Sequence, residues 1–414
     1  MRKIYSALDI GSSYIKLVVG EFLNGKLNIL CAVKSESRGF KNNQITDSEK
    51  LIDSINKVLN EASTKLNFKI TKLIVNIPTD YNDFKISESM VPVSNEDEIV
   101  SSKDILKVLQ NSSTDQIKPT EELLACLPIM FQVGDEETLS PLEKKGKTLS
   151  LKSVLVSTDK KRVYDLVKLL EKCEIEIVDI TTTGLVDYYN FKNKELDSKN
   201  TIIVNIGATT TNISVFSKGI YINNLCLDIG GNTIDKEIAM NYNIRKSDAI
   251  YLKENLALAT PRNADIKELA TIVDKDGKEI KINQQDISNL VNLKLKEMLK
   301  NVKKNINYLT KKEISYIIIT GGLAEFNDLA PILNKIFGNI IQIGFINDIG
   351  ARDASYSVCL GMLKYFNEKL TLRGKEYSMI DNEELEEMND SKSSKLSVSG
   401  DTILGKVFSY FFDN

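Results

Sequence analysis

The 414-residue sequence contains no histidine, and this absence removes several kinds of catalytic site. Histidine is the most common general base in enzymes and a member of the serine and cysteine triads, so a hydrolase of that design is excluded. The five cysteines are far apart in the chain and form no C-x-x-C pair; they are Cys31, Cys126, Cys173, Cys226 and Cys359. A zinc site or a disulfide framework is therefore not expected, and this cysteine usage fits a reducing cytoplasm.

The sequence also lacks an excess of basic residues and a long apolar run. Its 54 Lys and Arg residues stand against 57 Asp and Glu residues, which gives a net charge of −3. Nucleic-acid-binding domains usually carry a basic surplus, so no nucleic-acid partner is expected. No run reaches the roughly 18 apolar residues of a membrane-spanning helix. The opening MRKIYSALDIG does not suit a signal peptide, because Asp9 interrupts its short apolar run.

One strand–turn–strand pattern is present twice, about two hundred residues apart. Residues 8–19 read LDIGSSYIKLVV, and residues 204–216 read VNIGATTTNISVF. A chain of this length is expected to form two or more domains, and the restart of the pattern at residue 201 suggests duplicated domains. Strands that alternate with helices favour an α/β fold.

Helical periodicity predicts helices at 47–66, about 102–110, 162–175, within 234–256 and at 284–308. Residues 83–160 have the pattern of a small α+β module inserted into the first domain. Residues 371–398 are polar and acidic without apolar periodicity, which predicts a disordered tether. The last stretch, 399–414, is apolar again.

The residue types in the repeated turns predict a phosphate site. Gly, Ser and Thr expose backbone N–H groups and hydroxyls, and their small side chains let an oxyanion approach closely. Asp9 could hold the water shell of Mg²⁺, and Lys16 could neutralise phosphate charge. Two further double glycines, at 230–231 before a helix and at 321–322 after a strand, extend the pattern. Each turn alone could be an ordinary hairpin, but the order of four such elements over about 310 residues is specific.

In this order the four elements resemble the nucleotide pocket of the actin/Hsp70/sugar-kinase superfamily. Within that superfamily the chain is similar, over essentially its whole length, to the bacterial cell-division family FtsA. The module at 83–160 stands where FtsA has its own subdomain, and GGNTIDKEIA and SDAIYLKEN resemble FtsA segments. The tether and apolar C-terminal stretch are also FtsA features that actin and Hsp70 lack. The resemblance implies a two-lobed, actin-like α/β fold with an inserted FtsA-type subdomain and a C-terminal amphipathic helix.

The resemblance also implies a division of the chain. Subdomain 1A would comprise 1–82, 161–199 and 347–370, and subdomain 1C would be the insertion at 83–160. Subdomain 2A would comprise 200–236 and 310–346, and subdomain 2B residues 237–309. A disordered linker at 371–398 and a membrane-targeting helix at 399–414 would follow.

The ligands implied by the resemblance are ATP and Mg²⁺, with Asp9 holding the metal through water. The expected nucleotide-binding residues are Asp9, Gly11, Ser12, Ser13, Lys16, Asn205, Gly207, Thr209, Thr210, Gly230, Gly231, Lys253, Gly321 and Gly322.

Five positions depart from the family pattern. Asn205 and Asn212 stand where the family usually has Asp, and Thr209 replaces a glycine. Ile250 replaces a glutamate expected to bond the ribose, and Thr182 falls where an acidic residue would orient the attacking water. We therefore predict a protein that binds ATP but hydrolyses it weakly or not at all. Whether it is an enzyme stays open at this point, and an Asn205→Asp change is expected to raise hydrolysis.

The C-terminal stretch has one apolar face if it is helical. That face consists of Ile403, Leu404, Val407, Phe408, Phe411 and Phe412. After a polar tether, such a helix favours binding to a membrane surface, although a terminal helix can also dock on its own domain. Lys406 is the only cation in the helix, so binding would depend on inserted apolar area and on avidity from polymerisation.

The resemblance implies a filament-forming protein that tethers FtsZ to the cytoplasmic face of the membrane at the division septum. The FtsZ tail would bind near Lys294, Lys300 and Lys304, within a basic helix that also carries Lys296 and Lys303. A solvated helix face is the alternative for these lysines. Two rival functions stay open: a PilM-like adaptor of a pilus or secretion machine, and an Hsp70-like or sugar-kinase-like ATPase.

Overall fold

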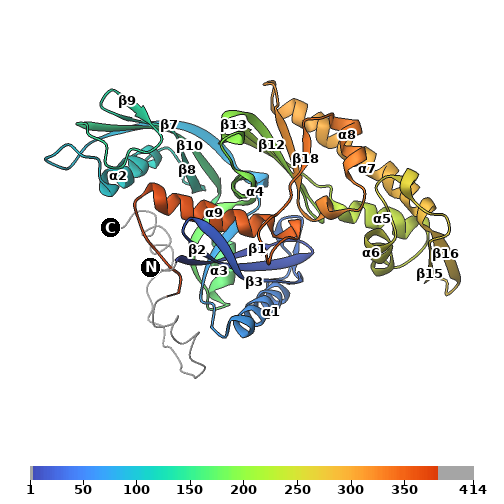
Figure 1. Ribbon diagram of the computed structural model, residues 1–414. Coiled ribbons are helices and arrows are strands. Elements are labelled where there is room, and N and C mark those ends of the chain that lie inside the picture. Colours follow the sequence, from blue (N-terminus) through green and yellow to red (C-terminus); the bar gives the residue numbers. More distant parts are fainter. Residues whose placement is uncertain (1–2, 381–414) are drawn as a thin grey trace.

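The computed structural model describes residues 3–380, and its first lobe is built on a five-stranded sheet of order β11-β6-β1-β2-β3 (Figure 1). The first three strands are antiparallel, whereas β6 runs parallel to β1 and β11 parallel to β6. The strands are β1 (Lys3–Ile10), β2 (Tyr14–Leu23), β3 (Lys26–Glu36), β6 (Lys72–Ile77) and β11 (Glu176–Thr182). A small hairpin, β4 (Phe40–Lys41) and β5 (Gln44–Ile45), follows β3.

Helices cover both faces of this sheet. Helices α1 (Ser48–Leu66) and α3 (Lys160–Glu171) pack on one face, and α4 (Thr183–Phe191) and α9 (Ser357–Leu372) on the other. The apolar stripe of α1 is buried, and the Asp47 side chain caps its first turn by accepting from the N–H of Lys50. The helix predicted at 47–66 is thus confirmed. Helix α3 begins and ends earlier than the predicted 162–175.

The second lobe has a five-stranded sheet of the same design. Read from the same end as the first sheet, its order is β18-β17-β12-β13-β14. Its first three strands are again antiparallel, and β17 and β18 are parallel additions. The strands are β12 (Asn200–Ile206), β13 (Thr211–Ser217), β14 (Ile220–Leu227), β17 (Tyr316–Thr320) and β18 (Ile341–Ile343). Asp9 pairs with Lys16 in the first hairpin, and Asn205 pairs with Asn212 in the second. The expected duplication is confirmed by this shared strand order and register.

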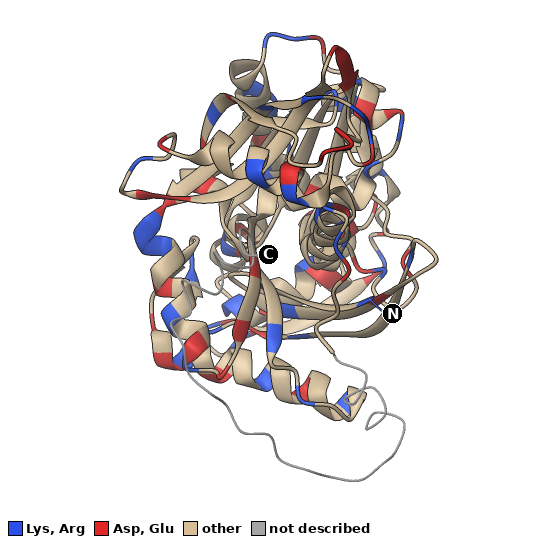
Figure 2. Cartoon of the chain, turned by 90° about the vertical axis from the view of Figure 1, so that its left-hand side faces the viewer, with Lys and Arg blue, Asp and Glu red and all other residues tan. Residues whose placement is uncertain are grey.

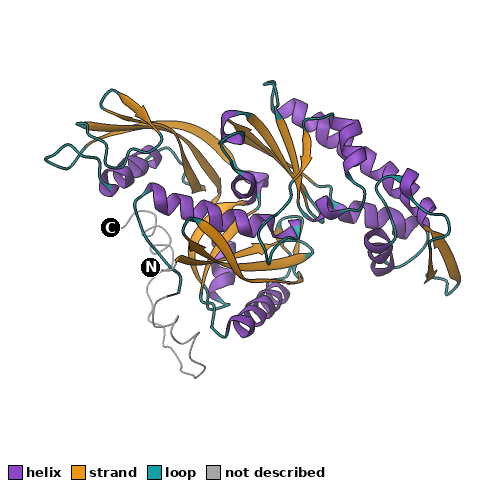
Figure 3. Cartoon of the chain, viewed as in Figure 1, coloured by secondary structure: helices purple, strands orange, loops and turns teal. Residues whose placement is uncertain are grey.

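The helices of the second lobe extend away from the first sheet (Figure 3). They are α5 (Gly231–Asn241), α6 (Lys246–Asn255), α7 (Gln284–Leu309) and α8 (Ala330–Phe337). The helical stretch predicted within 234–256 is divided in two, because Asn243 adopts a left-handed conformation with φ of 51°. A hairpin of β15 (Leu269–Val273) and β16 (Glu279–Asn283), which the sequence did not indicate, precedes α7.

The inserted module forms a four-stranded sheet of order β7-β10-β8-β9 with one helix, α2 (Ser102–Ser113). Its strands are β7 (Asp83–Pro92), β8 (Glu121–Val133), β9 (Glu136–Thr138) and β10 (Thr148–Asp159). The module has its own apolar cluster, which includes Val108, Phe131 and Leu149. In Figure 1 it lies at the opposite end of the molecule from β15 and β16. Helix α2 confirms the helix predicted near 102–110.

The two lobes share a buried aromatic contact. Tyr188 of α4 stacks on Phe216 of β13 with ring centroids 4.3 Å apart, and Phe216 stacks on Tyr221 of β14 at 5.0 Å. Helices α4 and α9 approach closely, since a Cβ atom at Gly361 would lie 2.0 Å from the carbonyl oxygen of Val186.

The described residues also form short 3₁₀ helices, which are η1 (Thr79–Tyr81), η2 (Leu196–Ser198), η3 (Pro261–Asn263), η4 (Gly322–Glu325) and η5 (Ala354–Tyr356).

The beginning of the predicted tether is ordered, which corrects its expected start at residue 371. Residues 371 and 372 belong to α9, and Met379 and Ile380 are buried. The N–H of Met379 donates to the carbonyl oxygen of Ile4, so this segment packs beside β1. The rest of the predicted tether and the predicted helix at 399–414 lie outside the described residues.

Charged residues of both signs are interspersed along the described chain (Figure 2). Between residues 3 and 380, every helix is too short or too polar to cross a membrane.

Candidate functional site

One cavity of about 840 Å³ is lined by both repeated turns. Of the nucleotide-binding residues predicted from the sequence, all but Gly230 line it. The first lobe contributes the turn after β1, and the second lobe contributes the turn after β12, the start of α5, helix α6 and the glycines after β17. The fold thus brings together four elements that are far apart in the sequence.

The two turns have the same internal hydrogen bond and touch each other. The N–H of Gly11 donates to the carbonyl oxygen of Tyr14 at 3.1 Å, and that of Gly207 donates to Thr210 at 2.9 Å. Thr209 Oγ1 donates to Ser12 Oγ at 2.9 Å, which joins one turn to the other. Thr209, a departure from the family pattern, therefore makes a direct contact between the lobes at the site.

Asp9 carries the negative charge of the first turn and is held from two sides. Lys16 Nζ lies 2.6 Å from Asp9 Oδ2, and Asn76 Nδ2 donates to Asp9 Oδ1 at 3.1 Å. Burial alone would lower the pKa of Lys16, but the charge and hydrogen bond of Asp9 outweigh it, so the pKa lies above its usual value. Lys16 is therefore a cation at the wall of the cavity.

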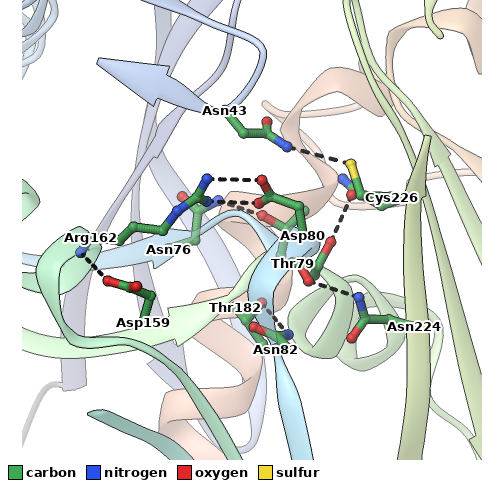
Figure 4. A network of polar contacts seen from close by, with 12 residues as sticks. Asn43, Asn76, Thr79, Asp80, Asn82, Asp159, Arg162, Thr182, Asn224 and Cys226 are labelled. Atoms are coloured by element: carbon green, nitrogen blue, oxygen red, sulfur yellow. Dashed lines mark hydrogen bonds and ion pairs between the residues drawn. The ribbon is translucent and has the colours of Figure 1, made fainter. Parts of the chain in front are cut away.

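Asn76 and Thr183 are site residues that the sequence did not indicate. Asn76 lies at the end of β6, and its amide also donates to Thr183 Oγ1 at 2.7 Å. Thr182, the residue expected to stand near the attacking water, is fully buried and accepts from Asn82 Nδ2 at 3.0 Å (Figure 4). Thr183 lines the cavity and Thr182 does not.

In the second lobe, Asn205 is held by a carboxyl group that lies behind the cavity. Asn205 Nδ2 donates to Asp187 Oδ2 at 2.7 Å, and Ser357 Oγ donates to Asp187 Oδ1 at 2.8 Å. Burial raises the pKa of Asp187 to about 7, and the charge of Asp9 adds to this effect. Because Asp187 comes from the middle of α4, no local pattern in the sequence pointed to it.

The double glycine at 230–231 supports the second turn. A Cβ atom at Gly230 would lie 2.6 Å from the carbonyl oxygens of Gly207 and Ala208. The N–H groups of Gly231 and Asn232 donate to these two carbonyls at 2.9 and 2.8 Å. These two hydrogen bonds hold the turn that lines the cavity.

Helix α6 forms the other end of the cavity. Lys253 Nζ lies 2.7 Å from Asp235 Oδ1, and both side chains are buried. Ile250 lines the cavity as expected, and Glu254 follows one helical turn later on the same face. A carboxylate is thus available beside the position where the family's glutamate is missing. Ile250, Leu323 and Phe326 add apolar side chains to the lining of the cavity.

The donor groups suit a hydrated divalent cation better than a directly ligated one. Within residues 3–380, no cluster of three or more Cys, Asp or Glu side chains could hold a metal. Asp9 offers one carboxylate at the cavity, beside Lys16. Mg²⁺ usually keeps several waters and binds through one or two carboxylates and the phosphates of its substrate, so these residues fit it.

The lysines predicted to bind a partner differ in their surroundings. Lys294 is only 19% exposed and pairs with Glu297 at 2.8 Å and with Glu237 at 3.8 Å. Lys303 donates to the carbonyl oxygen of Ile336. Lys300 and Lys304 are exposed on α7. The residues predicted to bind a membrane, 403–412, lie outside the described part of the chain.

Comparisons with known proteins agree with this geometry. Residues 202–361 match the family model described as cell division protein FtsA. The chain is 24% identical over 377 residues to the cell division protein FtsA of Bacillus subtilis, covering 90% of this chain and 86% of the relative. It is 22% identical over 384 residues to FtsA of Escherichia coli K12, covering 89% and 91%.

The solved structures that resemble this chain show its fold. A structure titled PilM-PilN type IV pilus biogenesis complex aligns with a TM-score of 0.58 at 14% identity, covering 87% of this chain and 97% of that one. MreB5 of Spiroplasma citri bound to ADP aligns with a TM-score of 0.54 at 14% identity, covering 90% and 98%. The predicted actin-like fold is confirmed.

Proposed function

We propose, since this chain is an FtsA-like protein of the actin-like superfamily, that it acts in bacterial cell division as an ATP-binding tether for FtsZ. ATP would bind between the lobes and favour assembly of filaments at the cytoplasmic face of the membrane. The relatives that it matches over about 90% of its length are named cell division proteins.

The observation that carries the proposal is the cavity that both turns line. A nucleoside triphosphate has an apolar base and an anionic tail. The Asp9 and Lys16 end of the cavity, with its hydroxyls and backbone N–H groups, suits the tail. The apolar side chains of Ile250, Leu323 and Phe326 suit the base. Bound Mg²⁺ would neutralise phosphate charge, with Asp9 holding its water shell.

We further propose that hydrolysis is weak, with a turnover well below about 1 s⁻¹. Apart from Lys16, a cation, the side chains joined to Asp9 by hydrogen bonds at the cavity are the neutral Asn76 and, through it, Thr183. A threonine hydroxyl or an amide is a poor proton acceptor at neutral pH. The chain would therefore use ATP chiefly as a structural ligand between its lobes.

The division into subdomains 1A, 1C, 2A and 2B is proposed with the same boundaries as in the sequence analysis. On subdomain 2B, exposed Lys300 and Lys304 are the better candidates for an acidic FtsZ tail, because Lys294 already has two acidic partners. The apolar face that includes Phe408 and Phe411 would insert into the membrane surface, and a filament would add avidity.

Vesicle co-sedimentation with a labelled FtsZ C-terminal peptide tests this proposal. With MgATP, we expect the wild-type chain to bring the peptide down with lipid vesicles. Phe408→Asp with Phe411→Asp should lose at least about tenfold in lipid binding, because two charges would enter the apolar phase. As a matched control, Thr402→Asp with Ser409→Asp adds the same charges to the polar face and should still bind. Equal sedimentation of both double variants would contradict the anchor.

The PilM-like rival is distinguished by its partner. The similarity to the PilM-PilN structure reflects a shared fold at 14% identity. We expect the chain to bind the FtsZ peptide and to show no binding to an inner-membrane pilus peptide. The reverse preference would contradict the proposed function and favour the adaptor.

A further inference from the structure

Each lobe has one carboxyl–amide pair beside its turn, and the two pairs have their members exchanged. In the first lobe, the carboxyl group of Asp9 is on the hairpin strand and accepts from the amide of Asn76 at 3.1 Å. In the second lobe, the amide of Asn205 is on the hairpin strand and donates to the carboxyl group of Asp187 at 2.7 Å. Asp9 and Asn205 are equivalent, since each pairs with the residue seven positions later across its hairpin.

The carboxyl group of Asp187 is enclosed by several elements. It is fully buried, and Ser357 at the start of α9 donates to its second oxygen at 2.8 Å. The ionisable groups near enough to act on it electrostatically are Asp9 of β1, Lys16 of β2 and Tyr221 of β14. Asp187 does not line the cavity, and the cavity-lining side chain that it contacts directly by a hydrogen bond is Asn205.

The orientation of the Asn205 amide is fixed from both sides. One N–H of its nitrogen is used by Asp187, and the carbonyl oxygen Oδ1 is the acceptor of the side chain. Oδ1 lies against the backbone at Gly321, where an added Cβ atom would be only 2.4 Å away. Asn205 and Gly321 both line the cavity, so the acceptor Oδ1 lies at its wall.

We infer that Asp187 is the positioning residue of the second turn. It holds Asn205 by its nitrogen, so the second lobe presents a neutral carbonyl oxygen to the cation of a bound nucleotide while its acidic group stays one layer behind. The part of this inference that concerns a ligand rests on the proposed function, whereas the pair itself does not.

Because Asp187 is bonded to Asn205, an Asn205→Asp variant would do more than add an acid to the cavity. That variant alone would place two carboxyl groups within hydrogen-bond distance in a buried site, where one of them must hold a proton. The exchange variant, Asn205→Asp with Asp187→Asn, keeps one carboxyl–amide pair in the order found in the first lobe. Only the exchange would bring a second carboxylate to the cavity without a buried carboxyl pair.

Thermal unfolding without nucleotide tests the pair. We expect Asn205→Asp to lower Tm by about 5 °C or more at pH 8.5 and by less at pH 6, because the shared proton is lost as the pH rises. The exchange variant should recover most of this loss. Asn212→Asp is the matched control, because Asn212 is as buried as Asn205 but accepts its hydrogen bond from Thr79 at 2.7 Å. It should change Tm little, and an exchange variant no more stable than Asn205→Asp would overturn the inference.

Calorimetric titration with a non-hydrolysable ATP analogue, with and without Mg²⁺, tests the role at the cavity. We expect the exchange variant to depend on Mg²⁺ at least about tenfold more than the wild type, because it adds a carboxylate for the hydrated ion. An unchanged Mg²⁺ dependence would overturn the positioning role even if the unfolding data support the pair. Failure of the wild type to bind the analogue would instead contradict the proposed function.

Discussion

Two adjacent glycines follow β17, and only one of them is required by the shape of the site. Gly321 has a φ of 85°, a conformation that favours glycine, and a Cβ atom there would also meet the carbonyl oxygen of Ile206 at 2.7 Å. Gly322, the next residue, has open space around the equivalent position. Both line the cavity, so the pair gives a comparison matched in location.

We expect Gly321→Ala to lower the free energy of unfolding by about 2 kcal/mol or more, because the strained φ and the close contact add. The same change should weaken binding of a fluorescent ATP analogue at least about tenfold, since Asn205 and the backbone of Ile206 must move. Thermal unfolding and a titration with the analogue measure the two effects. Gly322→Ala should leave both near the wild type, and equal effects of the two variants would contradict this account.

At the level of elements, η1 joins three parts of the molecule (Figure 4). Thr79 donates to Asn212 Oδ1 at 2.7 Å and accepts from Asn224 on its carbonyl oxygen, which ties η1 to the second sheet. Asp80 forms two hydrogen bonds with Arg162 of α3, at 2.9 and 3.0 Å. The Arg162 guanidinium also lies 3.7 Å from the ring centroid of Tyr81. Since β7 begins directly after η1, this junction orients the inserted module relative to both sheets.

A double-mutant cycle on Asp80→Ala and Arg162→Ala measures how much this ion pair stabilises the junction. We expect a coupling free energy of about 1–3 kcal/mol, because the pair is bidentate and both side chains are about 80% buried. Lys69 and Glu174 give a control cycle, since their 2.9 Å ion pair is exposed at both ends. That cycle should show no measurable coupling. Similar coupling in the two cycles would mean that burial adds nothing at this junction.

For the whole molecule, the cavity between the lobes links their stabilities. A ligand that touches both turns stabilises only the arrangement in which both lobes are folded and in contact. The Thr209–Ser12 hydrogen bond joins the two turns directly. This arrangement favours one cooperative response over separate responses of the two lobes.

We expect MgATP at about 100 times its Kd to add about 2.7 kcal/mol to the free energy of unfolding. Scanning calorimetry should show this as a rise of the whole unfolding transition by about 2 °C or more. Adenosine, which lacks the phosphates, should give a smaller shift at the same concentration. A transition that divides in two, with only one part shifted, would contradict binding across the lobes.

Local sequence determined much of the fold. The Gly, Ser and Thr turns, the capped α1 and the apolar strands are consequences of short-range steric and hydrogen-bonding preferences, so residues within a few positions predict them. The repeat of one turn predicted the duplicated sheets, and the order of the turns predicted that Asp9, Gly207 and Gly321 share a cavity. The predicted start of the tether was wrong, because residues 371 and 372 belong to α9 and residues 379 and 380 are buried.

The tertiary structure alone decided which polar groups meet at the site. The hydrogen-bonded pairs are far apart in the sequence. Asn76 and Thr183 are separated by 107 positions, Ser12 and Thr209 by 197, and Asp187 and Ser357 by 170. No periodicity relates such residues, because their contact depends on how separate sheets and helices pack. The sequence therefore determined that the second turn carries an amide in place of an acid. Only the fold placed the carboxyl group of Asp187 behind that amide and set the direction in which the amide faces.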